Sequence, residues 1–259
     1  MKKITFTVHG QKLQGNLFYP EKVKPKNPAI LLLHGWKSSQ KRHIERAEHL
    51  VALGFICMTF DLRSHGVSEG DRSKLSIENY LTDVLAAYDF LKTQKYVNAD
   101  HIGVIGSSFG GYLGSLLTSK RSVKWLALQA PANYPDEGFE DPKPDDPAPI
   151  FPWRAEPKSY MEVQSLNAIH EYPNEILIVE SEYDEFVPKQ TIENYKNTIK
   201  NKDKLTYVFL KGADHSVREG DSSEQYLQIL TDWFKDKALV VKTVVFRVFF
   251  RWLSVGRLV

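Results

Sequence analysis

The stretch HIGVIGSSFGGYLG, residues 101–114, decides how the rest of the chain is interpreted. It begins as an apolar strand pattern, and then four glycines fall within nine positions, Gly106 to Gly114, around Ser107 and Ser108. A glycine costs about 1 kcal/mol relative to alanine inside a helix, so an ordinary helix would not place four of them here. The glycines therefore indicate a point where the backbone needs room.

Residues 106–110 form the pattern G-x-S-x-G between a predicted strand and a predicted helix, which is typical of a nucleophile elbow. The central residue of such an elbow is strained, and side chains at its flanks would collide with their neighbours. Ser107 as the centre would need glycine where Ile105 and Phe109 stand. Ser108 is therefore the predicted nucleophile, and the alternative is a glycine-rich turn without chemistry.

The composition is that of an ordinary globular protein. The chain has 259 residues, of which 42% are hydrophobic and 25% charged, which suits one α/β domain with a large core. The net charge of +2 gives no argument for a nucleic-acid partner. Cys57 is the only cysteine, and the N-terminus does not have the pattern of a signal peptide. We therefore expect a cytoplasmic protein with no metal and no cofactor.

Strand and helix patterns alternate along the chain. Strands are expected at 3–8, 12–19, 29–35, 55–61, 102–106, 123–129, 175–181 and 205–210. Helices are expected near 41–53, 75–91, from 109 onward, 188–199 and 222–236. Strands separated by helices predict an α/β fold, with a mostly parallel, twisted sheet of about eight strands and helices on both faces.

Chain order selects the base that would activate Ser108. In enzymes with such an elbow the order is serine, then an acid, then histidine, and two histidines follow Ser108. His170 precedes a late strand, whereas His215 follows the last predicted strand, at the edge where open parallel sheets gather their chemistry. His215 is the predicted base, and a plain surface histidine is the alternative.

The acid is expected in ESEYDEFVP, residues 180–188. Asp184 is favoured because it lies at the turn just before Val187 and Pro188, which open the next helix. The alternatives are the neighbouring glutamates, Glu180, Glu182 and Glu185.

These residues belong to a set of motifs that resembles the α/β-hydrolase superfamily. The set comprises GSSFGG, the HGW turn at 34–36, DLRSHGVSEG at 61–70, the D-x-x-V-P loop at 184–188 and ADH at 213–215. Over roughly residues 5–237 the chain is most similar to small bacterial esterases near the dienelactone hydrolase and acylaminoacyl-peptidase-like branch.

The resemblance implies the α/β-hydrolase fold and an acyl-enzyme mechanism with Ser108, Asp184 and His215 as the triad. It also implies an oxyanion hole made by the backbone N–H groups of Phe109 and Trp36. Such donors are worth roughly 3 kcal/mol of barrier each. The oxyanion turn is HGW, which departs from the HGGG of one lipase and esterase group.

A proline-rich segment, residues 131–170, stands where larger relatives have a helical cap. It is either an exposed, stiffened loop or a short lid over the active site. In the lid interpretation Tyr134, Phe151 and Trp153, with Tyr160, are candidate walls of a substrate pocket. In a different segment, Asp61, Arg63 and His65 are expected to brace the loop that faces the elbow rather than to act in catalysis.

The last stretch, residues 238–259, is apolar and basic and contains no acid. Its charges interrupt the apolar pattern, so it is a poor transmembrane helix, and they gather on no single helical face. A membrane-surface anchor, a self-association contact and a sequence foreign to the family all stay open.

The sequence thus predicts a single hydrolase domain, residues 1–237, that cleaves small carboxylic esters. Acyl thioesterase or amidase/peptidase activity with the same triad is an alternative, although a prolyl-oligopeptidase-type peptidase usually carries a propeller for which no residues are left. A hydrolase-fold binding protein without turnover is the alternative from another class. Phosphate-loop, dinucleotide and zincin motifs are absent from the sequence.

Overall fold

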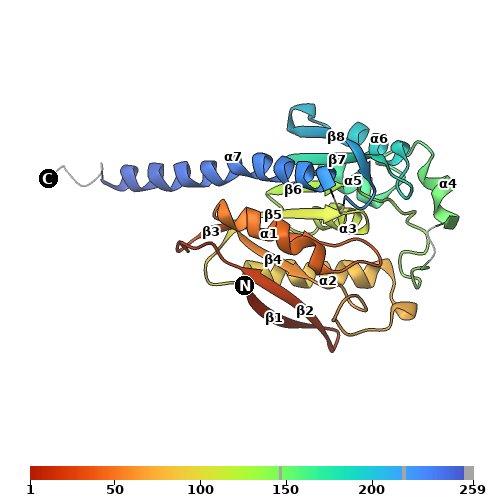
Figure 1. Ribbon diagram of the computed structural model, residues 1–259, viewed down its shortest axis with the longest axis horizontal. Coiled ribbons are helices and arrows are strands. Elements are labelled where there is room, and N and C mark those ends of the chain that lie inside the picture. The colour runs from red at the N-terminus through yellow and green to blue at the C-terminus, as the bar shows by residue number, and fades with distance from the viewer. Residues whose placement is uncertain (146–147, 218–219, 254–259) are drawn as a thin grey trace.

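The computed structural model describes residues 1–145, 148–217 and 220–253, with side chains up to Ala238. Its centre is an open sheet in the order β1-β2-β4-β3-β5-β6-β7-β8 (Figure 1). The strands are β1 (Lys2–Val8), β2 (Gln11–Phe18), β3 (Asn27–Leu33), β4 (Ile56–Phe60), β5 (Val97–Ser107), β6 (Trp125–Gln129), β7 (Glu175–Tyr183) and β8 (Leu205–Asp214).

The pairing of these strands confirms the predicted α/β fold. β1 pairs antiparallel with β2, and β2 pairs antiparallel with β4. Every later pair along the sheet is parallel. In the opening strand β1, exposed and buried residues alternate from Lys3 to Val8, whereas every residue of β3 and β4 is buried. This is the difference expected between a strand with one solvated face and a strand covered on both faces.

Helices cover both faces of the sheet. They are α1 (Ile44–Ala52), α2 (Ile77–Lys92), α3 (Phe109–Leu117), α4 (Phe151–Arg154), α5 (Gln164–Glu171), α6 (Lys189–Thr198) and α7 (Gly220–Leu253). One core holds buried residues of α2, α3, α5 and α6, and the second core, on the other face, holds those of α1 and α7. Short 3₁₀ helices lie in the connections between strands and helices: η1 (Gln40–His43), η2 (Arg72–Lys74), η3 (Ala148–Ile150) and η4 (Lys202–Lys204).

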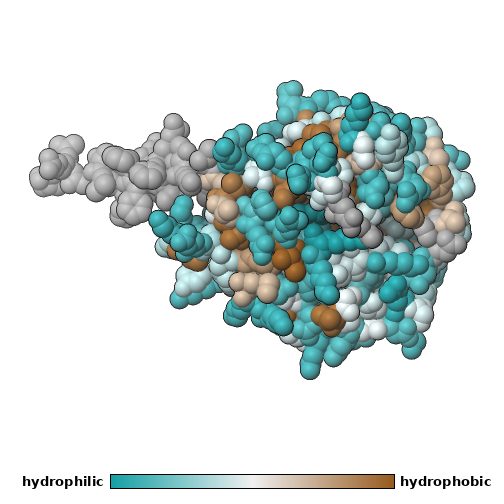
Figure 2. Space-filling view, viewed as in Figure 1, coloured by the Kyte–Doolittle hydropathy of each residue, from teal (hydrophilic) through white to brown (hydrophobic). Residues whose placement is uncertain are grey.

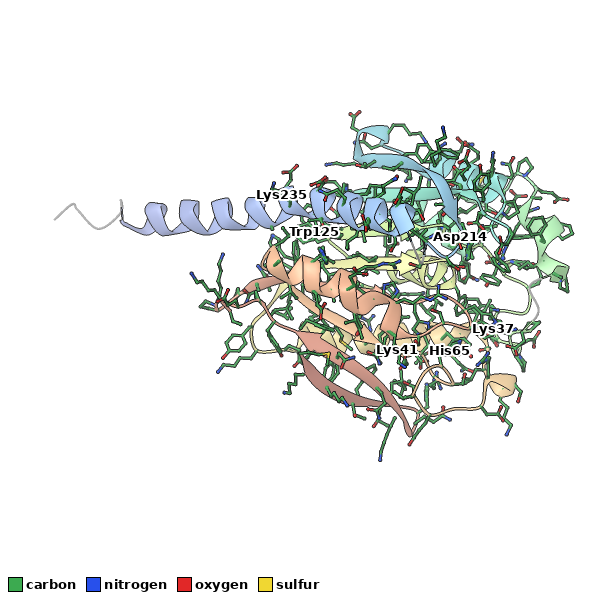
Figure 3. The ribbon with its side chains drawn as sticks, in the orientation of Figure 1. Lys37, Lys41, His65, Trp125, Asp214 and Lys235 are labelled. Atoms are coloured by element: carbon green, nitrogen blue, oxygen red, sulfur yellow. The ribbon has the colours of Figure 1, made fainter. Side chains whose placement is uncertain are left out.

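The carboxyl ends of the parallel strands lie together at one edge of the sheet, and the candidate site residues follow them. The loops that follow β3, β5, β7 and β8 carry His34, Ser108, Asp184 and His215 at that end. Figure 3 shows Lys37, His65 and Asp214 toward this end of the molecule and Lys235 and Trp125 toward the other. In an open parallel sheet this carboxyl edge is where ligands bind.

The last helix is longer than the sequence predicted. A helix was expected to end near residue 236, but α7 continues to Leu253 and extends away from the sheet (Figure 1). No proline or glycine interrupts the sequence from Asp221 to Leu253, so nothing in it forces the helix to stop. The domain boundary proposed at residue 237 therefore lies inside one continuous helix.

The surface drawn in Figure 2 is mostly hydrophilic and is interrupted by separate hydrophobic patches. None of the helices in the described part of the chain combines the length and apolar character needed to cross a membrane.

Candidate active site

Ser108 occupies the strained turn between β5 and α3. Its φ of 52° and ψ of −114° lie in a region that non-glycine residues rarely adopt. Its backbone N–H donates to the Gln129 carbonyl at 2.9 Å, which holds the turn in place. A Cβ at Gly106 would overlap the Gly110 carbonyl, and a Cβ at Gly110 would overlap that of Leu33. The glycines that flank the serine are therefore required by close backbone packing.

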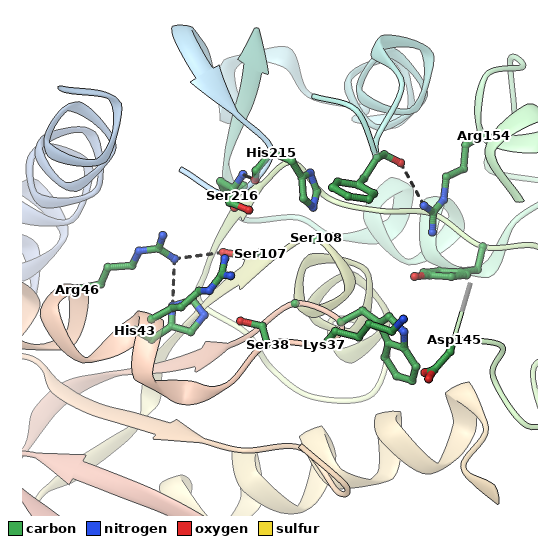
Figure 4. A pocket seen from close by; sticks show the side chains of 16 residues that line it. Lys37, Ser38, His43, Arg46, Ser107, Ser108, Asp145, Arg154, His215 and Ser216 are labelled. Carbon is green, nitrogen blue, oxygen red and sulfur yellow. Dashed lines mark hydrogen bonds between the residues drawn. The ribbon is translucent and has the colours of Figure 1, made fainter. Parts of the chain in front are cut away.

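Ser108 and His215 line one pocket of about 290 Å³ (Figure 4). The described residues that complete its wall are Gly35, Trp36, Lys37, Ser38, Arg42, His43, Arg46, Ser107, Gln129, Tyr134, Asp145, Arg154, Phe186 and Ser216. The hydroxyl of Ser107, the residue before the predicted nucleophile, is engaged by another side chain. It accepts a hydrogen bond from Nη1 of Arg46 at 3.3 Å.

His215 is held on two sides. Its Nδ1 lies 2.8 Å from Oδ2 of Asp184, and its carbonyl accepts a hydrogen bond from Nε2 of Gln129 at 3.0 Å. The Phe186 ring stands edge-on against the imidazole, with ring centroids 5.1 Å apart. Both members of the pair are shielded from solvent, since the side chains of His215 and Asp184 are 14% and 7% exposed.

The loop that follows β7 brings Asp184, rather than a glutamate, to His215. Glu180 instead accepts from the Tyr207 hydroxyl at 2.7 Å, and Glu182 accepts from the Gly212 N–H at 2.7 Å. Glu185 is exposed. The other histidine after the elbow, His170, lies elsewhere, with its ring stacked on Tyr160 and its Nδ1 2.9 Å from the Thr198 carbonyl.

Of the two residues predicted to supply oxyanion donors, Phe109 directly follows Ser108 in the chain and Trp36 lines the same pocket. Phe109 is the first residue of α3, and Trp36 follows Gly35 directly after the end of β3. A Cβ on Gly35 would lie 3.4 Å from that of Ser108, so the HGW turn runs against the elbow. Neither N–H donates to a backbone carbonyl of a turn, loop or cap in the described part of the chain.

The DLRSHG loop is fixed by buried polar contacts. Oδ1 of Asp61 accepts from the Gln40 N–H at 2.7 Å, and Arg63 forms a buried ion pair with Asp83 at 2.5 Å. Burial lowers the pKa of His65 to about 3, so its ring is neutral. These contacts agree with the bracing role expected from the sequence.

The four residues proposed as pocket walls lie in different parts of the structure. Tyr134 lines the pocket of Ser108, and Trp153 lines a neighbouring pocket of about 400 Å³ that shares Tyr134. Phe151 is 41% exposed and lines neither of these two pockets, and Tyr160 packs on His170.

Sequence reasoning missed several residues of this pocket, Arg46, Gln129, Arg154 and Phe186 among them. Gln129 ends β6 at the carboxyl edge of the sheet, which was a usable signal. No signal in the sequence marked Arg154, because it lies in the proline-rich segment and its burial is set by contacts with residues far away in the chain. Among the described residues no three His, Cys, Asp or Glu side chains gather as a metal site would require.

The fold and this arrangement of side chains define a hydrolase of the α/β-hydrolase type. The chain belongs to the prolyl oligopeptidase family, whose sequence model matches residues 43–239, well over half of the chain.

Curated relatives match part of the chain, AidA and aneE among them. The quorum-quenching protein AidA of Acinetobacter baumannii is 30% identical over 126 residues, which are 48% of this chain and 40% of AidA. The thiohydrolase aneE of Aspergillus aculeatus is 33% identical over 107 residues, 40% of this chain and 33% of aneE. The match thus spans less than half the length of either relative.

Solved structures share the fold over nearly the whole chain. Est1E of Butyrivibrio proteoclasticus, solved with ferulic acid, has a TM-score of 0.71 at 20% identity and covers 90% of this chain and 98% of its own. An alpha-beta serine hydrolase homologue from Coxiella burnetii has a TM-score of 0.67 at 18% identity, covering 89% and 96%.

Proposed function

We propose that this chain is a serine esterase that cleaves carboxylic esters through an acyl-enzyme, with Ser108 as nucleophile, His215 as base and Asp184 as orienting acid. The observation that carries the proposal is the strained elbow at Ser108, in one pocket with a histidine whose Nδ1 lies 2.8 Å from Asp184. A serine on such an elbow, with a base and an orienter beside it, is the arrangement that nucleophilic catalysis requires.

The hydrogen bond to Asp184 determines which ring nitrogen of the proposed base carries the proton. An ionised carboxylate only accepts, so Nδ1 of neutral His215 carries the proton and Nε2 keeps its lone pair. Nε2 takes the Ser108 proton as Oγ attacks the carbonyl carbon. It then gives that proton to the alcohol oxygen as the ester C–O bond breaks. Water attacks the acyl-enzyme by the same route and releases the acid.

The backbone N–H groups of Trp36 and Phe109 are the donors proposed for the oxyanion. The N–H of Phe109 also belongs to the first turn of α3, where the helix dipole favours negative charge. No charged side chain is needed at this position.

A thioester is a second candidate substrate, because the relative aneE is named a thiohydrolase. The same groups would attack a thioester carbonyl, and the thiolate leaves more easily than an alkoxide. Comparing kcat/KM for oxygen and sulfur esters of one acyl group separates the two: the proposal expects the oxygen ester to be turned over, and activity confined to the thioester overturns it.

A fluorophosphonate probe tests the nucleophile directly, because it forms a covalent bond only with an activated serine. The full chain should be labelled, and mass mapping should place the adduct on Ser108. Ser108→Ala should take no label, while Ser107→Ala should still be labelled. A folded chain that stays unlabelled contradicts the proposal.

A further inference from the structure

Arg154 is a buried cation in the wall of the Ser108 pocket. It is 3% exposed, and its guanidinium lies over the Tyr134 ring, 4.5 Å from the centroid. Nε donates to the Asn133 carbonyl at 2.8 Å and Nη1 donates to the Phe186 carbonyl at 3.3 Å. Nη2 is buried and has no hydrogen-bond partner in the described structure. None of the salt bridges of the described residues involves Arg154. A buried cation without an opposite charge is costly, so an anion bound against this guanidinium would be stabilising.

A second cation packs on the same ring. Nζ of Lys143 lies 5.1 Å from the centroid of Tyr134 and 3.6 Å from that of Trp36, and it donates to the Pro144 carbonyl at 3.2 Å. Burial, followed by the positive charge of Arg154, lowers the pKa of Lys143 to about 7. Lys143 lines the neighbouring pocket that shares Tyr134, and the contribution of Arg154 to its lowered pKa is consistent with a positive field beside that ring.

The described wall of the pocket contains too few carboxylates to balance its cations. Asp145 is the one carboxylate among the described lining residues, its side chain is 59% exposed, and it faces Arg72 at 3.6 Å. Asp184 is already engaged by His215. The lining cations are Lys37, Arg42, Arg46 and Arg154.

Arg154 is also coupled in space to the proposed base. Its Nη1 binds the Phe186 carbonyl, and the Phe186 ring packs edge-on against His215 (Figure 4). Phe186 therefore links Arg154 to His215. A substrate group bound by Arg154 would be held in a defined position relative to the proposed base.

We propose that the pocket takes esters that carry a carboxylate, and that the Arg154 guanidinium binds that carboxylate. This rests on the esterase function proposed above and names its substrate class. Arginine suits the role because its planar fork is fixed here by Asn133 and Phe186, so little freedom is lost on binding. The carboxylate belongs either to the acyl part or to the alcohol part of the ester.

Matched esters test the proposal in both orientations. Monoethyl adipate against ethyl hexanoate places the charge on the acyl side, and 4-acetoxybenzoate against its methyl ester places it on the alcohol side. The readout is the ratio of kcat/KM for the charged ester to that for the neutral one. Arg154→Gln should lower this ratio about tenfold or more in one pair, because a charge-assisted hydrogen bond is lost. Arg154→Lys should restore part of it.

Arg42→Gln is the matched control, since it removes one positive charge from the same pocket. It should change the ratio less than about threefold. An equal ratio in the parent and Arg154→Gln in both pairs overturns the proposal. An equal loss in Arg42→Gln also overturns it, because a general positive field would then explain the preference.

Binding to Ser108→Ala keeps the test independent of turnover and of whether Arg154→Gln folds. Calorimetry should show one charged ester binding about tenfold or more tightly than its neutral partner. Equal affinities within both pairs overturn the inference and leave ester hydrolysis intact. A parent chain that neither cleaves the esters nor takes the fluorophosphonate label rejects the esterase proposal instead.

Discussion

Nδ1 of His215 lies 2.8 Å from Oδ2 of Asp184, and the other oxygen of the same carboxylate holds the loop. Oδ1 accepts from the N–H groups of Phe186 and Val187 at 2.9 and 2.8 Å. The Asp184 carboxylate thus fixes both the orientation of the His215 imidazole and the turn on which Asp184 itself lies. The two tasks can be separated by mutation.

Asp184→Asn should keep the fold and lose turnover by as much as ~10⁴-fold. The asparagine oxygen still accepts from Phe186 and Val187, but its NH₂ group faces Nδ1 and favours the wrong tautomer of His215. Urea unfolding and kcat measure the two effects.

The neighbouring acids are the controls. Glu182→Gln and Glu185→Gln should reduce kcat far less, because Glu182 binds a backbone amide and Glu185 is exposed. Should Glu182→Gln be as damaging as Asp184→Asn, the acid is on the predicted loop but misassigned.

The elbow glycines give a stability prediction with an internal control. Gly110→Ala should destabilise by several kcal/mol, because its Cβ would overlap the Leu33 and His34 carbonyls. Gly114 lies in the same helix, but a Cβ there meets side-chain atoms at ordinary distances of 3.4 Å or more. Gly114→Ala should be neutral or stabilising by up to about 1 kcal/mol. Urea unfolding of both variants measures the two changes in stability. Equal changes would contradict the requirement for glycine at position 110.

Much of the fold was predictable because its signals are local. The buried strands have apolar runs, and the G-x-S-x-G turn needs glycines within five residues, so Ser108 could be chosen by register alone. The order of acid and base along the chain then restricted the search for them to two loops, which contain Asp184 and His215. The helix α7 was judged too short because the sequence pattern beyond 237 is irregular, whereas helix continuation needs only the absence of a breaker.

The pocket wall was less predictable because its contacts are long-range. Arg154 is positioned by Asn133 and Phe186, 21 and 32 residues away. Nothing near Arg154 in the sequence marks it as buried. Phe151, a few residues earlier, looked equally suitable as a wall and is 41% exposed.

Lys143 predicts a pH dependence of stability. Its pKa in the folded chain is lowered to about 7, below the 10.5 usual for lysine, so between these values the unfolded chain binds more protons. Stability therefore rises with pH across this window, by at most ~1.4 kcal/mol per pH unit. Lys143→Met removes the titration. Urea unfolding from pH 7 to 9.5 should show the parent gaining stability relative to this variant, and a constant difference would contradict the prediction.

The end of the chain should be dispensable for catalysis. Deleting 240–259 should leave esterase activity within a few-fold, since the proposed catalytic residues precede residue 216. Phe234→Ala is the contrasting change, because Phe234 is fully buried against Phe55 and its loss should cost about 3–5 kcal/mol.

We propose that 238–259 mediates association with a membrane surface or with a second copy. The truncated chain should bind lipid vesicles less or elute as a smaller species. A truncation that unfolds the domain contradicts the assignment of these residues outside the catalytic unit.

Attack of Ser108 on the ester carbonyl is tested by measuring kcat of Ser108→Ala and of Ser107→Ala on one activated ester. Their hydroxyls are adjacent in sequence, but only Ser108 sits at the strained centre of the elbow, while Ser107 accepts from Arg46. We expect a loss of at least ~10⁴-fold for Ser108→Ala and retention of most activity for Ser107→Ala. Full activity in Ser108→Ala, or the reverse order of the two variants, would contradict attack by Ser108.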